Sequence, residues 1–109
     1  MSYKVDVTNG FKREAKRLIK KYASLKEEIG LLIDTLEETP RTGTSIGHDC
    51  YKVRLAITSK GKGKSGGARV ITCVFVKNET VYLLSIYDKS EQNDISDARL
   101  AELIKAISG

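Results

Sequence analysis

The chain has 109 residues, which suits a single domain, and 40% of them are hydrophobic, as in ordinary globular proteins. It contains no apolar run of 18 residues that would span a membrane and no apolar signal-peptide core at its start, so we expect a cytoplasmic protein. Two cysteines and one histidine exclude a disulfide framework and a conventional zinc site. The net charge of +5 favours an anionic partner, either nucleic acid or an acidic protein.

The first part of the chain predicts one strand and two helices. Apolar and charged residues alternate over about 2–7, which is typical of a half-buried strand. Thr8 or Asn9 then caps a first amphipathic helix, and Ser24 with Glu27 forms a capping box for a second. The apolar positions of the two helices are Phe11, Ala15, Leu18, Ile19, Tyr22, Leu25, Ile29, Leu32, Ile33 and Leu36. With almost no linker between them, the helices are expected to form an antiparallel hairpin.

Three strands and a last helix follow. A polar connection over 41–49 leads to a strand over 50–58, and apolar segments predict further strands over 68–76 and 80–87. Short links between these strands favour an antiparallel meander, and a last helix begins at about residue 96. We therefore predict one α+β domain over the whole chain, in the order β-α-α-β-β-β-α. The sheet is expected to be antiparallel, with the helices on one face or at its edge.

The positive charge is concentrated between Lys52 and Arg69, a stretch with six basic residues and no Asp or Glu. Its first half alternates as a strand does, with Lys52 and Arg54 on the outer face. Its second half, 59–67, holds four Gly and three Lys and predicts a mobile basic loop. Such a stretch suits a polyphosphate partner, because each phosphate that it neutralises releases counterions. The alternative is a solvated hairpin loop, in which lysines prevent aggregation.

Three segments resemble the RelE/ParE toxin superfamily: CYKVRL over 50–55, GARVI over 67–71 and VYLLSIY over 81–87. The likeness covers nearly the whole chain and is greatest to RelE-like and HigB-like toxins of bacterial type II toxin–antitoxin modules. It implies the RelE-like fold and a ribosome-dependent endoribonuclease that cleaves mRNA in the ribosomal A site and so inhibits translation. The implied reaction is attack of the ribose 2′-hydroxyl on the adjacent phosphate, without a metal or other cofactor. The implied partners are the ribosome with its 16S rRNA, the mRNA, and a cognate antitoxin with a helix-turn-helix part.

Cleavage of this kind needs a group that takes the 2′-hydroxyl proton, a cation over the phosphate and a proton donor for the leaving oxygen. By family position, the resemblance assigns these tasks to Lys52, Arg54 and Arg69. Lys89 stands where some relatives have a further arginine. The C-terminal tyrosine of the family has no counterpart, because Ile95 or Ser96 falls at its position.

Further RNA contacts are expected around this set. The loop lysines that we expect to contact rRNA or mRNA are Lys60, Lys62 and Lys64. Tyr87 either stacks on a base or belongs to the core. Glu91 and Asp94 are interpreted as solvated loop carboxylates rather than catalytic ones.

Two other functions stay open from the sequence. One is a ParE-type toxin that inhibits DNA gyrase by protein contact, although such relatives generally lack the basic set that this chain keeps. The other is a degenerate member that only binds RNA or an antitoxin, which the missing C-terminal tyrosine leaves open.

Overall fold

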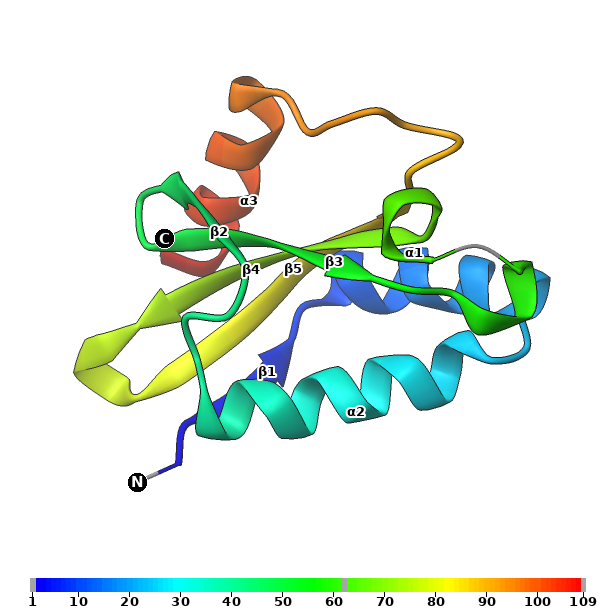
Figure 1. The fold of residues 1–109 in the computed structure, drawn as a ribbon. Coiled ribbons are helices and arrows are strands. Elements are labelled where there is room, and N and C mark those ends of the chain that lie inside the picture. Colours follow the sequence, from blue (N-terminus) through cyan, green and yellow to red (C-terminus); the bar gives the residue numbers. More distant parts are fainter. Residues whose placement is uncertain (1, 62, 109) are drawn as a thin grey trace.

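The computed structural model describes residues 2–61 and 63–108 and shows a five-stranded sheet between two layers of helix (Figure 1). The main elements are β1 (Lys4–Val7), α1 (Asn9–Lys21), α2 (Leu25–Glu38), β2 (Thr44–Gly47), β3 (Cys50–Leu55), β4 (Ala68–Phe75), β5 (Thr80–Asp88) and α3 (Asp97–Ser108). Three single turns of 3₁₀-helix lie between strands: η1 (Thr58–Lys60), η2 (Lys64–Gly66) and η3 (Val76–Asn78). Over the described ranges, no helix combines the length and apolarity that crossing a membrane requires.

The strand order is β1-β5-β4-β3-β2, and the predicted meander of β3, β4 and β5 is confirmed. The prediction of a wholly antiparallel sheet is wrong, because β1 pairs in parallel with β5. The helical hairpin between β1 and β3 accounts for this, since it carries the chain across one face of the sheet before the meander begins. β2 is an additional edge strand in the segment predicted to be a connection. Its sequence, TSIG, holds one apolar residue, so no alternation marks it as a strand.

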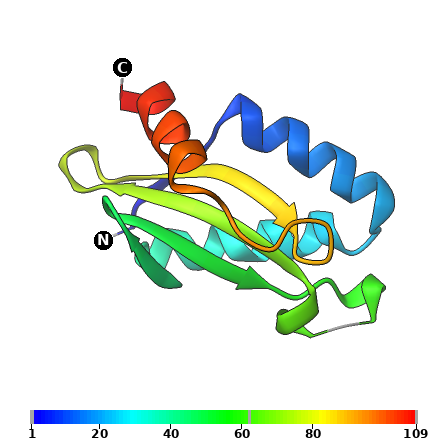
Figure 2. The same ribbon diagram turned by 90° about the horizontal axis from the view of Figure 1, so that it is seen from above.

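The helices cover both faces of the sheet, which corrects the expectation that they lie on one face or at an edge. In Figures 1 and 2, α1 and α2 lie on one side of the sheet and α3 on the other. The larger apolar cluster joins Phe11, Leu18, Leu25 and Leu36 to strand residues such as Val70. A smaller cluster lies under α3 and contains Cys50, Ile71, Cys73, Leu84, Tyr87, Leu100 and Leu103. Because β4 and β5 are apolar on both faces, each face needs a helical cover.

The turn between α1 and α2 positions the loop after β3. Ser24 Oγ accepts no capping hydrogen bond from the first turn of α2 and instead donates to Glu28 Oε1 (3.0 Å), so the predicted capping box is wrong. Glu28 Oε2 accepts hydrogen bonds from the backbone N–H (2.7 Å) and the hydroxyl (2.6 Å) of Thr58. The hydroxyl oxygens of Ser24 and Ser59 also lie 2.9 Å apart, and Ser24 Oγ accepts a hydrogen bond from the Ser59 N–H (2.9 Å). The start of the basic loop, predicted to be mobile, is therefore fixed to the helical hairpin.

A buried carboxylate holds the same loop from the other side. Asp88, at the end of β5, is fully buried, and its Oδ1 lies 2.6 Å from Lys60 Nζ. Its Oδ2 accepts a hydrogen bond from Tyr22 (2.7 Å), and its Oδ1 accepts two from Ser90. Burial favours the protonated carboxyl, but the hydrogen bonds from Lys60, Tyr22 and Ser90 outweigh it and hold the pKa of Asp88 far below its ordinary value.

Replacing Lys60 with alanine should cost about 3 kcal/mol of unfolding free energy, because it leaves the Asp88 carboxylate buried without its cation. Lys64→Ala, an exposed lysine in the same loop, is the control and should stay within about 0.5 kcal/mol of the wild type. Since the folded-state pKa of Asp88 is lowered, its stabilising effect is fully present above the unfolded-state pKa of about 4 and is lost progressively as the pH falls from there through the much lower folded-state pKa. The difference in unfolding free energy between wild type and Lys60→Ala, measured by urea denaturation, should therefore be smaller at pH 3 than at pH 7. A difference of the same size at both pH values would contradict this account.

Candidate functional site

Strand register places the predicted catalytic cations on one face of the sheet. Arg54 on β3 lies directly opposite Arg69 on β4, and Arg69 lies opposite Tyr87 on β5. Cross-strand partners project to the same face, and Lys52, two residues before Arg54, projects to that face as well. We call Lys52, Arg54, Arg69 and Tyr87 the basic face. Cys50 lies two residues before Lys52 on β3, so its side chain projects to the same side of the sheet, and it packs in the cluster under α3. The basic face and α3 are therefore on the same side of the sheet.

Arg69 is held rigidly, yet its charge is not neutralised. The side chain is only 6% exposed, and Nη1 donates to the carbonyl oxygens of Lys64 (2.7 Å) and Ala68 (3.0 Å). Nη2 donates to the carbonyl oxygen of Ser65 (3.3 Å). These acceptors are uncharged, and among the described residues no carboxylate forms an ion pair with Arg69. The η2 turn thus orients a guanidinium that keeps its full positive charge.

The other two cations of the basic face are more exposed and differ in their partners. Arg54 is exposed, and within residues 2–61 and 63–108 it has no hydrogen-bonded side-chain partner and no ion pair. Lys52 Nζ pairs with Asp94 Oδ1 at 3.1 Å. Hydrogen bonds from the Ile95 N–H and from Lys52 lower the pKa of Asp94, so this carboxyl is charged at neutral pH.

Tyr87 contributes its hydroxyl rather than its ring. The side chain is 4% exposed and belongs to the cluster under α3, so the ring is a core residue and is not free to stack on a base. Its hydroxyl donates to Asp94 Oδ1 at 3.5 Å. Burial, with the nearby Asp94 carboxylate, raises the pKa of Tyr87 to about 12, so the hydroxyl is a proton donor at neutral pH.

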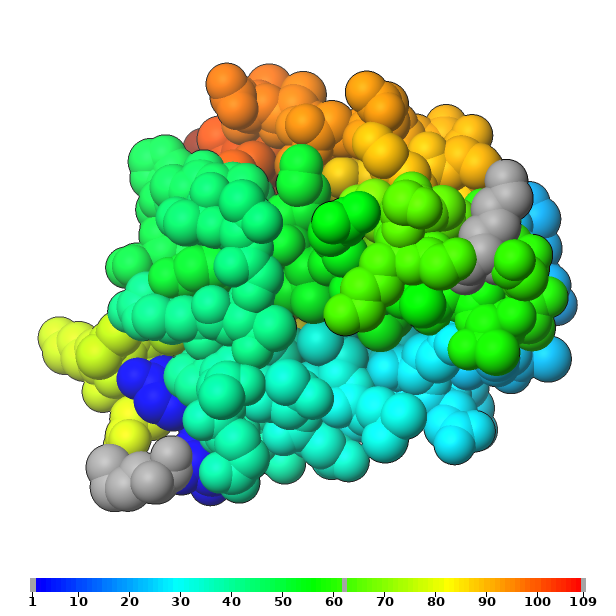
Figure 3. Space-filling model, viewed as in Figure 1, coloured from blue at the N-terminus to red at the C-terminus, as the bar shows by residue number. Residues whose placement is uncertain are grey.

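The remaining predicted residues lie around the basic face with separate contacts. Lys60 is bound to buried Asp88 and holds the loop, and its RNA contact stays a prediction. Lys89 Nζ donates to the backbone oxygen and to Oδ1 of Asn93, both at 2.8 Å, and so closes the loop after β5. Lys64 is exposed on η2, and Lys62 lies outside the described residues. Figure 3 shows the loop after β5 bordering the surface formed by β3 and the η1–η2 segment.

Asp94 is an exposed loop carboxylate, as the sequence predicts, and it also contacts two groups of the basic face. A loop aspartate gives no periodic signal, so only the chain's path could reveal it. In the part of the chain that the structure describes, no three His, Cys, Asp or Glu side chains are grouped to hold a metal ion.

A family model described as the RelE toxin of the RelE/RelB toxin–antitoxin system matches residues 4–108. The chain belongs to the RelE toxin family. Among solved structures, a mutant of E. coli toxin RelE in the free state is similar at 22% identity and a TM-score of 0.63, over 98% of this chain and 99% of that one. The RelBE complex of E. coli matches at 21% identity and a TM-score of 0.62, over 80% and 96% of the two chains. RelBE2 of Mycobacterium tuberculosis matches at 16% identity and the same TM-score, over 81% and 99%. These identities show a shared fold.

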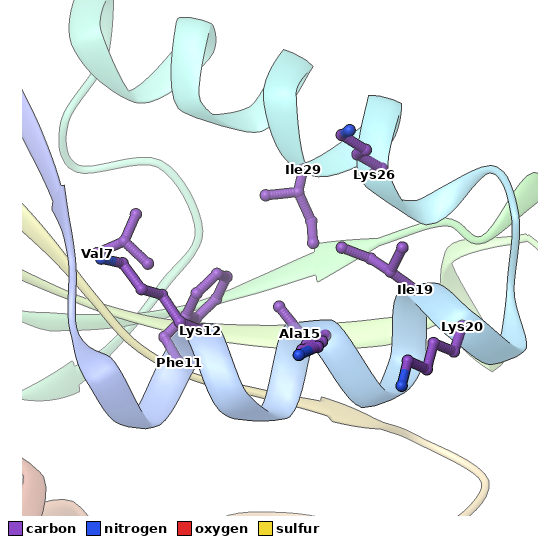
Figure 4. Close-up of a pocket in the computed structure, with 9 residues that line it drawn as sticks. Val7, Phe11, Lys12, Ala15, Ile19, Lys20, Lys26 and Ile29 are labelled. Carbon is purple, nitrogen blue, oxygen red and sulfur yellow. The ribbon is translucent and has the colours of Figure 1, made fainter.

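This RelE-family chain has a second distinctive surface, away from the basic face. A groove of about 490 Å³ opens between α1 and α2 (Figure 4). Its floor is apolar and is formed by Val7, Phe11, Ala15, Ile19 and Ile29. Its rim carries four lysines, Lys12, Lys16, Lys20 and Lys26. An apolar floor within a positive rim suits an amphipathic segment with acidic edges.

Gly67 brings the basic face together, because it lies immediately before β4 and beside the end of β3. A Cβ atom on this glycine would lie 2.2 Å from the carbonyl oxygen of Leu55 and 3.0 Å from Cα of Ala56. Its own carbonyl oxygen accepts a hydrogen bond from the Lys89 N–H (3.0 Å). Only glycine allows this close approach of the two strands beside Arg54 and Arg69.

Gly67→Ala should destabilise the fold by about 2 kcal/mol, because the methyl group forces β3 and β4 apart. Gly63→Ala is the matched control in the same loop, since a Cβ there meets nothing within 4 Å. Chemical denaturation of the two variants measures the difference directly. Equal midpoints for both would show that the strand contact at Gly67 tolerates a side chain.

Proposed function

We propose that this RelE-family toxin is a ribosome-dependent mRNA endoribonuclease that cleaves by attack of the 2′-hydroxyl on the adjacent phosphate. The observation that carries the proposal is the unneutralised guanidinium of Arg69, aligned across the strands with Arg54 and the Tyr87 hydroxyl. Cleavage places charge on the phosphate oxygens, and oriented cations stabilise that charge most where little solvent intervenes. Guanidinium suits this task because it is planar and permanently charged.

The basic face supplies separate groups for separate steps. We assign the phosphate to Arg69 and Arg54, removal of the 2′-hydroxyl proton to Lys52 acting as the neutral amine, and protonation of the leaving 5′-oxygen to Tyr87. With a pKa of about 12, the Tyr87 hydroxyl keeps its proton at neutral pH and can pass it to the leaving 5′-alkoxide, which is the stronger base. This places Tyr87 in the role left vacant by the family's C-terminal tyrosine. Lys89 contacts the loop and not the face, so we assign it to positioning that loop.

The ribosome is the proposed site of action, and the toxin would therefore work in the cytoplasm. Lys64 is exposed beside Arg69, where it extends the positive surface that an mRNA or rRNA backbone would contact. Phosphate contacts of this kind provide affinity without reading sequence, because the backbone is the same at every nucleotide. The codon itself would then be presented by the ribosome.

We infer that the cognate antitoxin places an acidic amphipathic helix in the α1–α2 groove. Two similar structures are complexes of a RelE-type toxin with an antitoxin, which supports a partner of this class for the present chain. The apolar floor would take the buried face of that helix, and the lysine rim would pair with its acidic edges. We expect the antitoxin to carry a helix-turn-helix DNA-binding part elsewhere in its chain.

Arg54→Ala should lower mRNA cleavage about 100-fold, because it removes a cation from the phosphate, and Arg69→Ala should lower it at least as much. Arg54 is the cleaner test, since it is exposed and its loss leaves the η2 turn intact. Arg13→Ala, an exposed arginine on α1, is the control and should cleave normally. Primer extension on an mRNA in a translating extract measures the cuts. If the extract translates normally and its mRNA stays uncut in the presence of the wild-type protein, and the protein inhibits supercoiling by gyrase, a ParE-type activity would be favoured instead.

The double variant Lys16→Glu, Lys20→Glu should bind the antitoxin about tenfold or more weakly, because it reverses charge on the groove rim. Its mRNA cleavage should be unchanged, since α1 lies on the opposite side of the sheet from the basic face. The control, Lys77→Glu with Lys105→Glu, makes the same charge change outside the groove. Titration calorimetry with the protein encoded by the adjacent gene measures the affinities. An equal loss of antitoxin affinity in both double variants would show that net charge, and not the groove, determines binding.

A further inference from the structure

We propose that the Asp94 carboxylate occupies the anion position of the basic face, and that an RNA phosphate must displace it. The proposal rests on the proposed function, because it takes the basic face to be the RNA site. It makes Asp94 a residue that regulates access to that site and takes no part in the chemical step.

The contacts of a single oxygen carry this inference. Asp94 Oδ1 lies 3.1 Å from Lys52 Nζ and accepts a hydrogen bond from the Tyr87 hydroxyl at 3.5 Å. It also accepts one from the Ile95 N–H at 2.8 Å. An ammonium and a hydroxyl that come from different strands, β3 and β5, thus converge on one negatively charged atom. A phosphate oxygen offers the same charge and the same acceptor geometry, so it fits the same position.

Arg54 and Arg69 project to the same face as these two groups, and neither is hydrogen-bonded to Asp94 within the described residues. The Asp94 carboxylate therefore contacts only two of the four groups of the basic face, Lys52 and Tyr87. A phosphodiester that replaced it would take over the contacts with Lys52 and Tyr87 and add those of two guanidinium groups. This difference would favour the phosphate over the carboxylate, because Asp94 contacts neither guanidinium in the described residues.

The carboxylate is free to leave without unfolding its loop. Its side chain is 59% exposed, so the ion pair with Lys52 is of the weak surface kind. The loop is anchored on either side of Asp94: Glu91 pairs with Arg17 (2.7 Å) and Lys21 (3.3 Å) on α1, and Ile95 packs into the cluster under α3. The stability of the loop therefore does not depend on the Asp94 contact.

The Asp94 carboxylate would therefore weaken the binding of any phosphate group that makes few other contacts with the protein. A lone phosphate ion competes with a carboxylate that is already tethered beside the basic face, and tethering gives the carboxylate a high effective concentration. An RNA backbone that is held in place, and that also contacts Lys64 and Arg54, overcomes this competition. The toxin would thereby favour positioned RNA over free phosphates and short fragments.

Asp94→Asn tests the proposal, because it keeps the shape of the side chain and removes its charge. Affinity is measured by fluorescence anisotropy with an RNA decamer that carries 2′-O-methyl groups and cannot be cleaved. We expect Asp94→Asn to bind the decamer about tenfold more tightly than the wild type. Asp97→Asn is the matched control: it makes the same change three residues away on α3, where the side chain is exposed, and should leave the affinity unchanged.

Each result decides between distinct explanations. Equal affinities for wild type and Asp94→Asn, or weaker binding by Asp94→Asn, would overturn the displacement proposal while leaving the nuclease proposal standing. An equal gain in Asp94→Asn and Asp97→Asn would also overturn it, because overall charge would then be the cause. If neither the wild type nor Asp94→Asn binds the decamer, both the displacement proposal and the RNA-binding role of the basic face fail.

Discussion

The juxtaposition of Arg54 and Arg69 on neighbouring strands is the constraint on which the site depends. Like charges directly opposite each other destabilise a sheet, so this register is retained at a cost. The structure limits that cost by turning the Arg69 guanidinium back onto carbonyl oxygens of η2, while Arg54 extends into solvent. Both cations lack a carboxylate partner in the described residues, and they project from facing positions of neighbouring strands.

The end of β5 and the loop that follows it distribute negative charge over the surrounding cations. Asp88 pairs with Lys60, Glu91 with Arg17 and Lys21, and Asp94 with Lys52. None of these carboxylates pairs with Arg54 or Arg69 in the described part of the chain. The same few residues therefore fix the loop after β3, attach their own loop to α1, and leave two guanidinium groups without a counter-charge. The electrostatic character of the basic face is set as much by the pairing of its neighbours as by its own residues.

The two helical layers serve different purposes around this centre. The hairpin of α1 and α2 buries the larger apolar cluster, and it also presents a lysine-rimmed groove on the side away from the basic face. The cluster under α3 includes the ring of Tyr87, so the Tyr87 hydroxyl is positioned by a helix that packs next to the basic face. The two helical layers are needed because β4 and β5 are apolar on both faces, and they leave the basic face and the groove on opposite sides of the sheet.

The sequence by itself determined the α+β class, the helical hairpin, the meander and the family, because each of these follows from local periodicity or from the order of the segments. It also placed Lys52 and Arg54 on one face by strand alternation, whereas the strand register set Arg69 opposite Arg54. Only the tertiary structure decided that β1 lies parallel to β5, that α3 covers the second face and that Lys60 is bound to a buried carboxylate. It alone brought Asp94 to Lys52. Those two ion pairs join residues 28 and 42 positions apart. A pairing at such a distance depends on how whole elements pack, and no residue pattern within either segment encodes it.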